Sequence, residues 1–237
     1  MLHGMRASIP GLVIVALAAL GGCDALTGAA NKVNPFASFE TRCARLPASR
    51  VEVVQGEVTP TQDHSLSHRS LTQLAQDDPD AHRTYGLTRA TFSENAQLDI
   101  RGLRDASTKR SCARPQVRVE LGMGPMTVYV ARELEGDACR VAAVTEHEMK
   151  HVAVYRDHLR AAAADLADRL PELYGQRVFV AGDSAQTEAQ MRGMLQEFMG
   201  AFMRESTRRL KARQDEVDSA EEYDHVGRAC GGMAVAE

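Results

Sequence analysis

Residues 138–170 contain neither glycine nor proline and are rich in alanine, and this segment constrains the fold more than any other. Asp137, which directly precedes the segment, is a favourable N-cap, and Pro171, which directly follows it, is a stop signal. We therefore expect one helix of roughly 30 residues, well above the usual length in globular domains.

A second long helix is predicted from about Asp183 to residue 217. Gln186 stands three residues after Asp183, which is the spacing of a capping box. Apolar side chains then recur at helical spacing and predict a stripe that faces the core: Met191, Leu195, Phe198 and Phe202. Since a short loop, residues 171–183, joins the two helices, we expect them to pack as an antiparallel pair.

The first half of the chain favours short strands, because apolar and polar residues partly alternate between turn signals. The predicted strands are residues 50–56, 83–91, 97–103, 116–122 and 126–133. Met123-Gly124-Pro125 lies between the last two and predicts a turn, hence a hairpin. The predicted fold class is α+β, with a small antiparallel sheet and an edge hairpin packed on the long helix and the second helix.

Composition supports a folded body and excludes some function classes. Of the 237 residues, 44% are apolar and 25% charged, as in ordinary globular proteins. The net charge is −4, so no broad basic surface indicates nucleic-acid binding. No apolar run reaches the roughly 18 residues that a membrane-spanning helix needs.

The predicted long helix carries the motif His147-Glu148-Met149-Lys150-His151. His147 and His151 are four residues apart, so they share one helical face and can reach one metal ion. Glu148 lies beside them, where it can take a proton from a metal-bound water. The H-E-x-x-H pattern therefore predicts a metal site with a general base.

This motif resembles that of the zincins, the zinc metallopeptidases with an H-E-x-x-H helix. The resemblance extends over roughly residues 80–230 to a family of predicted secreted zinc-dependent proteases of unknown function, which also place a cysteine before the motif and a Tyr-Asp pair after the following helix. Cys139 and Tyr223-Asp224 correspond to these residues, and Tyr223 is a candidate for steadying an oxyanion. His225-Val226-Gly227 follows where the family typically has a His-Gly pair.

The resemblance implies a zincin-like fold, Zn²⁺ as cofactor, and hydrolysis of peptide bonds through a metal-bound water that Glu148 activates. It also implies that an edge strand holds an extended peptide substrate by strand addition.

A zinc site needs a third protein ligand. Metzincins continue the motif with a glycine and a third histidine, but Val154 and Asp157 occupy those positions here. If the helix continues, His158 lies about 10 Å from His151 along the axis, too far to share the ion.

The preferred third ligand is Glu205, on the second helix. Met149 lies 21 residues before Leu170, and Glu205 lies 21 residues after Ser184. An antiparallel pair of helices that starts level at the 171–183 loop would therefore place Glu205 beside Met149. Glu205 also extends the apolar stripe, where a carboxylate is costly unless it is paired or bound to metal. The alternatives are His225, Glu188, Glu197 and Asp224.

The N-terminus resembles a bacterial lipoprotein signal. Residues 1–22 combine Arg6, a short apolar stretch and the small residues that precede Cys23. The expected mature protein carries lipid on Cys23, uses residues 23–45 as lipidated cysteine and flexible tether, and folds over 46–237 as the metallopeptidase domain. It would be membrane-anchored in the bacterial cell envelope and face the periplasm; Asp24 hints at the inner membrane, but which membrane stays open.

The other four cysteines suit two disulfides in an oxidising compartment. Three pairings are possible, and the preferred one is Cys112–Cys139 with Cys43–Cys230, because the first pair brackets the expected hairpin. Their spacing, without a C-x-x-C, does not fit a zinc ribbon.

The leading hypothesis is a membrane-anchored zinc metallopeptidase that acts on a peptide or protein substrate. One alternative is a non-catalytic envelope lipoprotein, a binding or structural module derived from a degenerate zincin. Another is zinc-dependent hydrolysis of a non-protein amide such as a cell-wall peptide. Replacing Glu148 with glutamine separates the first two.

Overall fold

The computed structural model describes residues 37–75 and 84–232. The predicted signal peptide, Cys23 and the first part of the predicted tether lie outside the described residues. The helices are α1 (Phe39–Ala44), α2 (His68–Leu74), α3 (Ala138–Tyr174), α4 (Ser184–Val217) and α5 (Ala220–Arg228), with short 3-10 turns η1 (Arg132–Leu134) and η2 (Ala229–Gly231). The strands are β1 (Arg50–Gln55), β2 (Pro60–Asp63), β3 (Gly86–Arg89), β4 (Phe92–Arg104), β5 (Ser111–Met123), β6 (Met126–Val130) and β7 (Phe179–Ala181).

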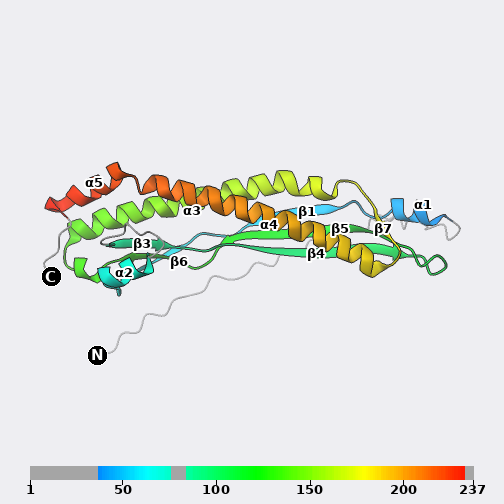
Figure 1. The fold of residues 1–237 in the computed structure, drawn as a ribbon, viewed down its shortest axis with the longest axis horizontal. Coiled ribbons are helices and arrows are strands. Elements are labelled where there is room, and N and C mark those ends of the chain that lie inside the picture. Colours follow the sequence, from blue (N-terminus) through cyan, green and yellow to red (C-terminus); the bar gives the residue numbers. More distant parts are fainter. Residues whose placement is uncertain (1–36, 76–83, 233–237) are drawn as a thin grey trace, which may run out of the picture. The chain divides into compact units, whose positions relative to one another are not determined.

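The strands form two mixed sheets, which confirms the α+β class (Figure 1). In the first sheet β5 pairs in parallel with β1 and antiparallel with β4 and β7. In the second sheet β6 pairs in parallel with β2 and antiparallel with β3. The order β1-β5-β4 is thus repeated as β2-β6-β3, because the same three stretches of chain continue from one sheet into the next.

The predicted single antiparallel sheet and the hairpin between residues 116–122 and 126–133 are wrong. Gly124-Pro125 marks an interruption of a continuing strand, since β5 and β6 belong to different sheets. Pro125 has no N–H to give to a ladder, and the pairing of β5 with β4 ends at Met123 while that of β6 with β2 begins at Met126. The Gly124 N–H bridges the break by donating to the Thr91 carbonyl at 2.7 Å. The hairpin of the first sheet is instead β4–β5.

Both long helices begin where their caps predict. The Asp137 side chain accepts from the Arg140 N–H at the start of α3, and Asp183 accepts from the Gln186 N–H at the start of α4. Pro171 does not end α3, which continues to Tyr174. Tyr174 is fully buried and its hydroxyl donates to the Met191 carbonyl of α4, so tertiary packing supports this last turn.

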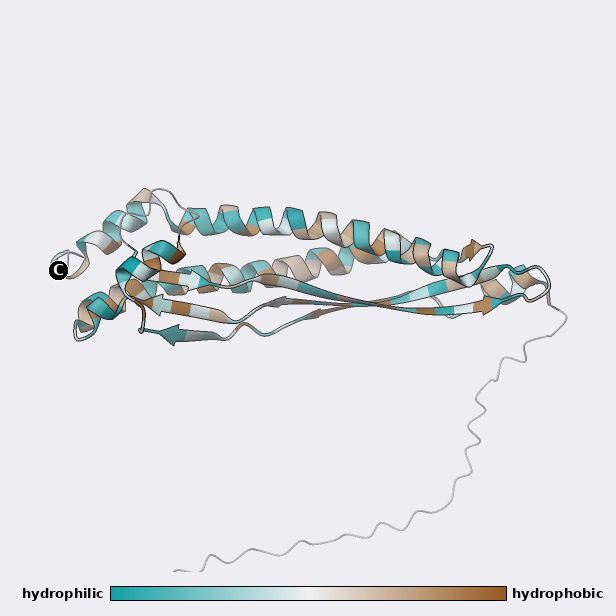
Figure 2. Cartoon of the chain, turned by 60° about the horizontal axis from the view of Figure 1, so that its bottom comes forward, coloured by the Kyte–Doolittle hydropathy of each residue, from teal (hydrophilic) through white to brown (hydrophobic). Residues whose placement is uncertain are grey.

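The helices α3 and α4 run antiparallel, as predicted, and share the main core with the first sheet. Their contacts occur in opposite order along the two helices: His151 with Gln214, His158 with Ser206, and Tyr174 with Met191. The sheet supplies Ala113, Val117, Val119 and Leu121, alternate residues of β5 that are all buried. Figure 2 shows this alternation of hydrophobic and hydrophilic residues along the long strands.

The predicted disulfide pairing is wrong. Cys43 is bonded to Cys112, and Cys139 to Cys230. Cys112 lies at the start of β5, where it packs with Phe39 and Cys43 of α1. Cys139 lies beyond the far end of β5 and β6, which together span roughly 60 Å at about 3.3 Å per residue. The first disulfide belongs to a folded body that begins at Ser38, so residues 39–44 are helix where a tether was expected.

In the described ranges, no helix has both the length and the apolar character that are needed to cross a membrane.

Candidate metal centre

The two histidines of the motif lie side by side on α3, as their spacing predicts. Their ring centroids are 5.0 Å apart and the two Nε2 atoms are 3.3 Å apart. His147 is buried and the His151 side chain is only 12% exposed. Both rings therefore present the same nitrogen to a common point that solvent barely reaches.

Asp218 completes this cluster. It is the C-cap of α4, and the next residue, Ser219, is the N-cap of α5. The junction between the helices directs the Asp218 carboxylate at the histidines, with Oδ1 at 3.2 Å from His151 Nε2 and 3.3 Å from His147 Nε2. Among the described residues, His147, His151 and Asp218 form the one group of ligand atoms close enough together to hold a metal ion.

The other nitrogen of each ring is held by a side-chain oxygen. His147 Nδ1 lies 3.2 Å from Glu222 Oε1, and His151 Nδ1 lies 2.7 Å from Gln214 Oε1. The Gln214 amide group donates to the His151 carbonyl, which fixes which end of the amide is the oxygen. Because these oxygens accept hydrogen bonds, each neutral ring carries its proton on Nδ1 and presents a lone pair from Nε2.

The electrostatics of the cluster favour positive charge at its centre. Burial by itself lowers the pKa of His147 and of His151, but the hydrogen bonds to Asp218 and the charge of Glu148 outweigh it and raise both pKa values. Burial likewise opposes ionisation of Asp218, yet hydrogen bonds from the two imidazoles hold the pKa of this carboxyl far below its usual range.

Glu148 is buried beside the cluster, on the side of α3 that faces β3. Thr88 of β3 donates a hydrogen bond from Oγ1 to Glu148 Oε2 at 2.7 Å. Burial raises the pKa of Glu148, although the neighbouring imidazoles and the Thr88 hydroxyl oppose that rise. A buried carboxyl with a raised pKa beside the candidate metal ligands is suited to proton transfer.

Glu205 lies away from the cluster, so the geometry replaces it with Asp218 as the candidate third ligand. Glu205 precedes Gln214 by nine residues on α4, which is about 13 Å along the helix axis. Its carboxylate pairs with Arg209 and with Arg169 of α3. Solvent and these cations satisfy the charge, so the argument that only a metal could do so does not hold.

The alternative ligands are also placed elsewhere. Glu188 and Asp224 are exposed and pair with arginines one helical turn away, and Glu197 is exposed on α4. His158 is buried and bonds to Ser206 Oγ at 2.9 Å. Tyr223 is 53% exposed, with its ring centroid 6.0 Å from that of His147.

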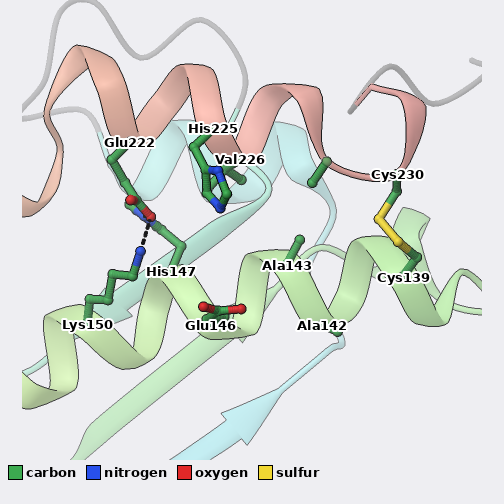
Figure 3. Close-up of a pocket in the computed structure, with 11 residues that line it drawn as sticks. Cys139, Ala142, Ala143, Glu146, His147, Lys150, Glu222, His225, Val226 and Cys230 are labelled. Carbon is green, nitrogen blue, oxygen red and sulfur yellow. Dashed lines mark hydrogen bonds and ion pairs between the residues drawn. A yellow bond between two sulfur atoms is a disulfide. The ribbon is translucent and has the colours of Figure 1, made fainter.

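His225 lines a pocket of about 300 Å³ between α3 and α5, on the outer side of His147 (Figure 3). The Cys139–Cys230 disulfide closes one end of this pocket, and the Lys150–Glu222 ion pair, with 2.6 Å between Nζ and Oε1, stands at the other. His225 points into the pocket and is not part of the cluster.

Sequence reasoning missed Asp218 and the partners Gln214, Glu222 and Thr88. One local signal was present: Ser219 and Glu222 have the spacing of a capping box, and the Ser219 side chain does accept from the Glu222 N–H. That signal places a helix start next to Asp218. It does not reveal that Asp218 faces His151 and His147, which lie 67 and 71 positions earlier in the chain.

No family model, no curated protein and no solved structure matches this chain.

If the cluster holds a metal ion, replacing Glu222 with glutamine is expected to weaken its affinity for added Zn²⁺ by roughly 10–100-fold, because the charged acceptor on His147 Nδ1 is lost. Competition with a chromophoric chelator measures this affinity. The matched control is Glu221→Gln, which removes the same charge from the neighbouring, exposed position. Equal effects of the two variants would show that only net charge matters.

Proposed function

We propose that this protein is a zinc-dependent hydrolase that cleaves peptide bonds. The observation that carries the proposal is the convergence of His147 Nε2, His151 Nε2 and Asp218 Oδ1 at 3.2–3.3 Å from one another. With both ring protons engaged on Nδ1, three lone pairs face one another, an arrangement that repels unless a cation lies between them.

The donor set fits zinc. Two imidazoles and one carboxylate are the kind of three-residue set that catalytic zinc sites use, and they leave one position open. The oxygen partners on both Nδ1 atoms are the outer interactions expected of metal-binding histidines. Bound zinc would supply a Lewis acid that polarises the substrate carbonyl and lowers the pKa of a water in the open position.

Glu148 is the proposed general base. Its carboxylate is adjacent to the cluster, is shielded from bulk solvent and has a raised pKa. In this role it accepts a proton from the attacking water and passes it to the leaving amine.

Strand β3 is the proposed binding edge for an extended substrate. It lies at the edge of the second sheet and packs on α3 at Glu148. The Ala131 N–H donates to the Tyr85 carbonyl, so the alternate residues Gly86 and Thr88 direct their backbone groups away from β6. An extended peptide can pair with those groups by strand addition.

The sequence supports a second part of the proposal, namely that the protein acts in the bacterial cell envelope. Lipid on Cys23 would anchor it to a membrane, and the two disulfides suit an oxidising compartment such as the periplasm.

The test measures metal and activity together. Full-length protein, purified in detergent without chelators, is expected to contain about one zinc per chain by mass spectrometry. It should cleave members of a fluorogenic peptide library. His147→Ala should lose both the zinc and the cleavage, whereas His64→Ala, at an exposed position outside the cluster, should lose neither.

If the wild-type protein binds no zinc after metal is added with its disulfides intact, the hydrolase proposal fails. A non-catalytic envelope lipoprotein then becomes the better reading.

A further inference from the structure

We propose that Thr88 is a positioning residue that orients the general base Glu148, in a space that exists only because residue 86 is glycine. This inference rests on the proposed function, because it assigns a role within the same site.

The first step is the contact itself. Thr88 Oγ1 lies 2.7 Å from Glu148 Oε2 and 3.2 Å from the Glu148 main-chain oxygen. Glu148 is only 3% exposed, so water does not compete freely for its carboxylate. Among the described residues, Thr88 is the one that forms a hydrogen bond with this carboxylate. A single hydroxyl therefore determines which oxygen of Glu148 is engaged.

The second step is the space around the carboxylate. A Cβ atom on Gly86 would lie 2.3 Å from Glu148 Oε1 and 2.6 Å from Val144 Cγ1. Contacts this short do not occur between unbonded atoms, so any side chain at residue 86 displaces Glu148 or the strand. Gly86 and Thr88 are two residues apart on β3, so they lie on the same face of the strand, the one that faces α3. Gly86 provides the space for the carboxylate, and Thr88 supplies the hydrogen bond to it.

The consequence is a carboxylate with two distinct oxygens. Oε2 is held by Thr88 and Oε1 lies against the backbone of Gly86, so the orientation of the carboxylate is set from both sides. A glutamate side chain has three rotatable bonds, and a base that sampled other rotamers would be out of line with the attacking water for much of the time. A misplacement of about 1 Å in such a group costs roughly 100-fold in rate.

The same residue also meets the substrate. The backbone N–H and carbonyl of Thr88 point to the edge of β3 that no other described strand pairs with, where an extended peptide would pair, while its hydroxyl points to the base. Pairing of a peptide with β3 would restrain Thr88 and hence Glu148. The structure thus links recognition of an extended backbone to alignment of the base.

The kinetic test compares Thr88→Val, which keeps the shape and loses the hydroxyl, with Thr88→Ser, which keeps the hydroxyl. With zinc-loaded full-length protein and a fluorogenic peptide, Thr88→Val should lower kcat by roughly 10–100-fold at unchanged zinc content and nearly unchanged KM. Thr88→Ser should restore kcat to within about threefold of wild type. Equal losses of kcat in both variants, or an increase in KM with kcat unchanged, would overturn the proposal.

A second pair of variants tests the space. Gly86→Ala should lower kcat although Thr88 is intact, because the added methyl group meets Glu148. Gly193→Ala is the matched control, since a Cβ there meets nothing within 4 Å on α4. If Gly86→Ala has wild-type kcat, the close approach does not constrain the base.

A double-mutant cycle that measures Tm provides a readout that does not depend on activity. In metal-free protein, Thr88→Val should lower Tm by roughly 3–10 °C, because it leaves the buried carboxylate without a donor. In a Glu148→Met background the same substitution should change Tm very little. Additive shifts would refute the contact. An inactive wild-type protein with non-additive shifts would instead refute the hydrolase proposal and reduce Thr88 to a structural role.

Discussion

Replacing Glu148 with glutamine is expected to abolish hydrolysis by the zinc-loaded protein and to leave its zinc content unchanged. Glutamine has the same shape and can still accept the hydrogen bond from Thr88, but it cannot take up a proton. General-base catalysis typically contributes 10²–10⁴-fold, so kcat should fall by about that factor. Fluorogenic peptide hydrolysis and zinc analysis on the same preparation measure both quantities.

The control is Glu172→Gln, which makes the same chemical change at an exposed position near the far end of α3. It should hydrolyse the peptide at the wild-type rate. If Glu148→Gln retains full activity, Glu148 is not the base. If the protein binds zinc but neither form hydrolyses any peptide, the metal serves another purpose, and the non-catalytic alternative is favoured.

Replacing Asp218 with alanine is expected to weaken zinc binding by more than 100-fold, because a ligand is lost and even outer partners of ligands are worth 10–100-fold. The same substitution at Glu205 should leave zinc binding unchanged. Its ion pairs are on the surface, where solvent screens them and they add little to stability, so Tm should change little. Titration of metal-free protein with zinc in the presence of a competing chelator compares the two.

This pair of variants decides between two sites that differ by the packing of α3 against α4. If Glu205→Ala loses zinc and Asp218→Ala does not, the histidines take their third ligand from within α4. The cluster at the junction between α4 and α5 would then be incidental.

The parts of the fold that sequence predicted are those with local causes. Asp137 and Asp183 begin their helices because a side chain two or three residues from a free N–H can cap it, whatever the rest of the chain does. Strand pairing has no such local cause. Gly124-Pro125 is compatible both with a reversal and with an interruption of a strand, and only the alignment with β3 and β4 distinguishes them.

The candidate site divides in the same way. The spacing of His147 and His151 follows from the helical repeat, so two of the three candidate ligands, together with Glu148, were predictable. The third candidate ligand, Asp218, depends on how far α4 is shifted along α3. Counting from the connecting loop assumed that the helices start level, but Tyr174, the last residue of α3, contacts Met191, about two turns into α4. That shift brings Gln214 and Asp218, not Glu205, to the histidines.

The disulfide between Cys139 and Cys230 joins two residues that are 91 positions apart, and all three candidate ligands lie between them. The bond therefore closes a covalent ring that carries the whole candidate metal centre. A closed ring has fewer unfolded conformations than an open chain, so bringing Asp218 to the histidines costs less conformational entropy. If the cluster binds a metal ion as proposed, oxidation of these two cysteines and capture of the ion favour each other, and the proposed centre forms best where disulfides persist.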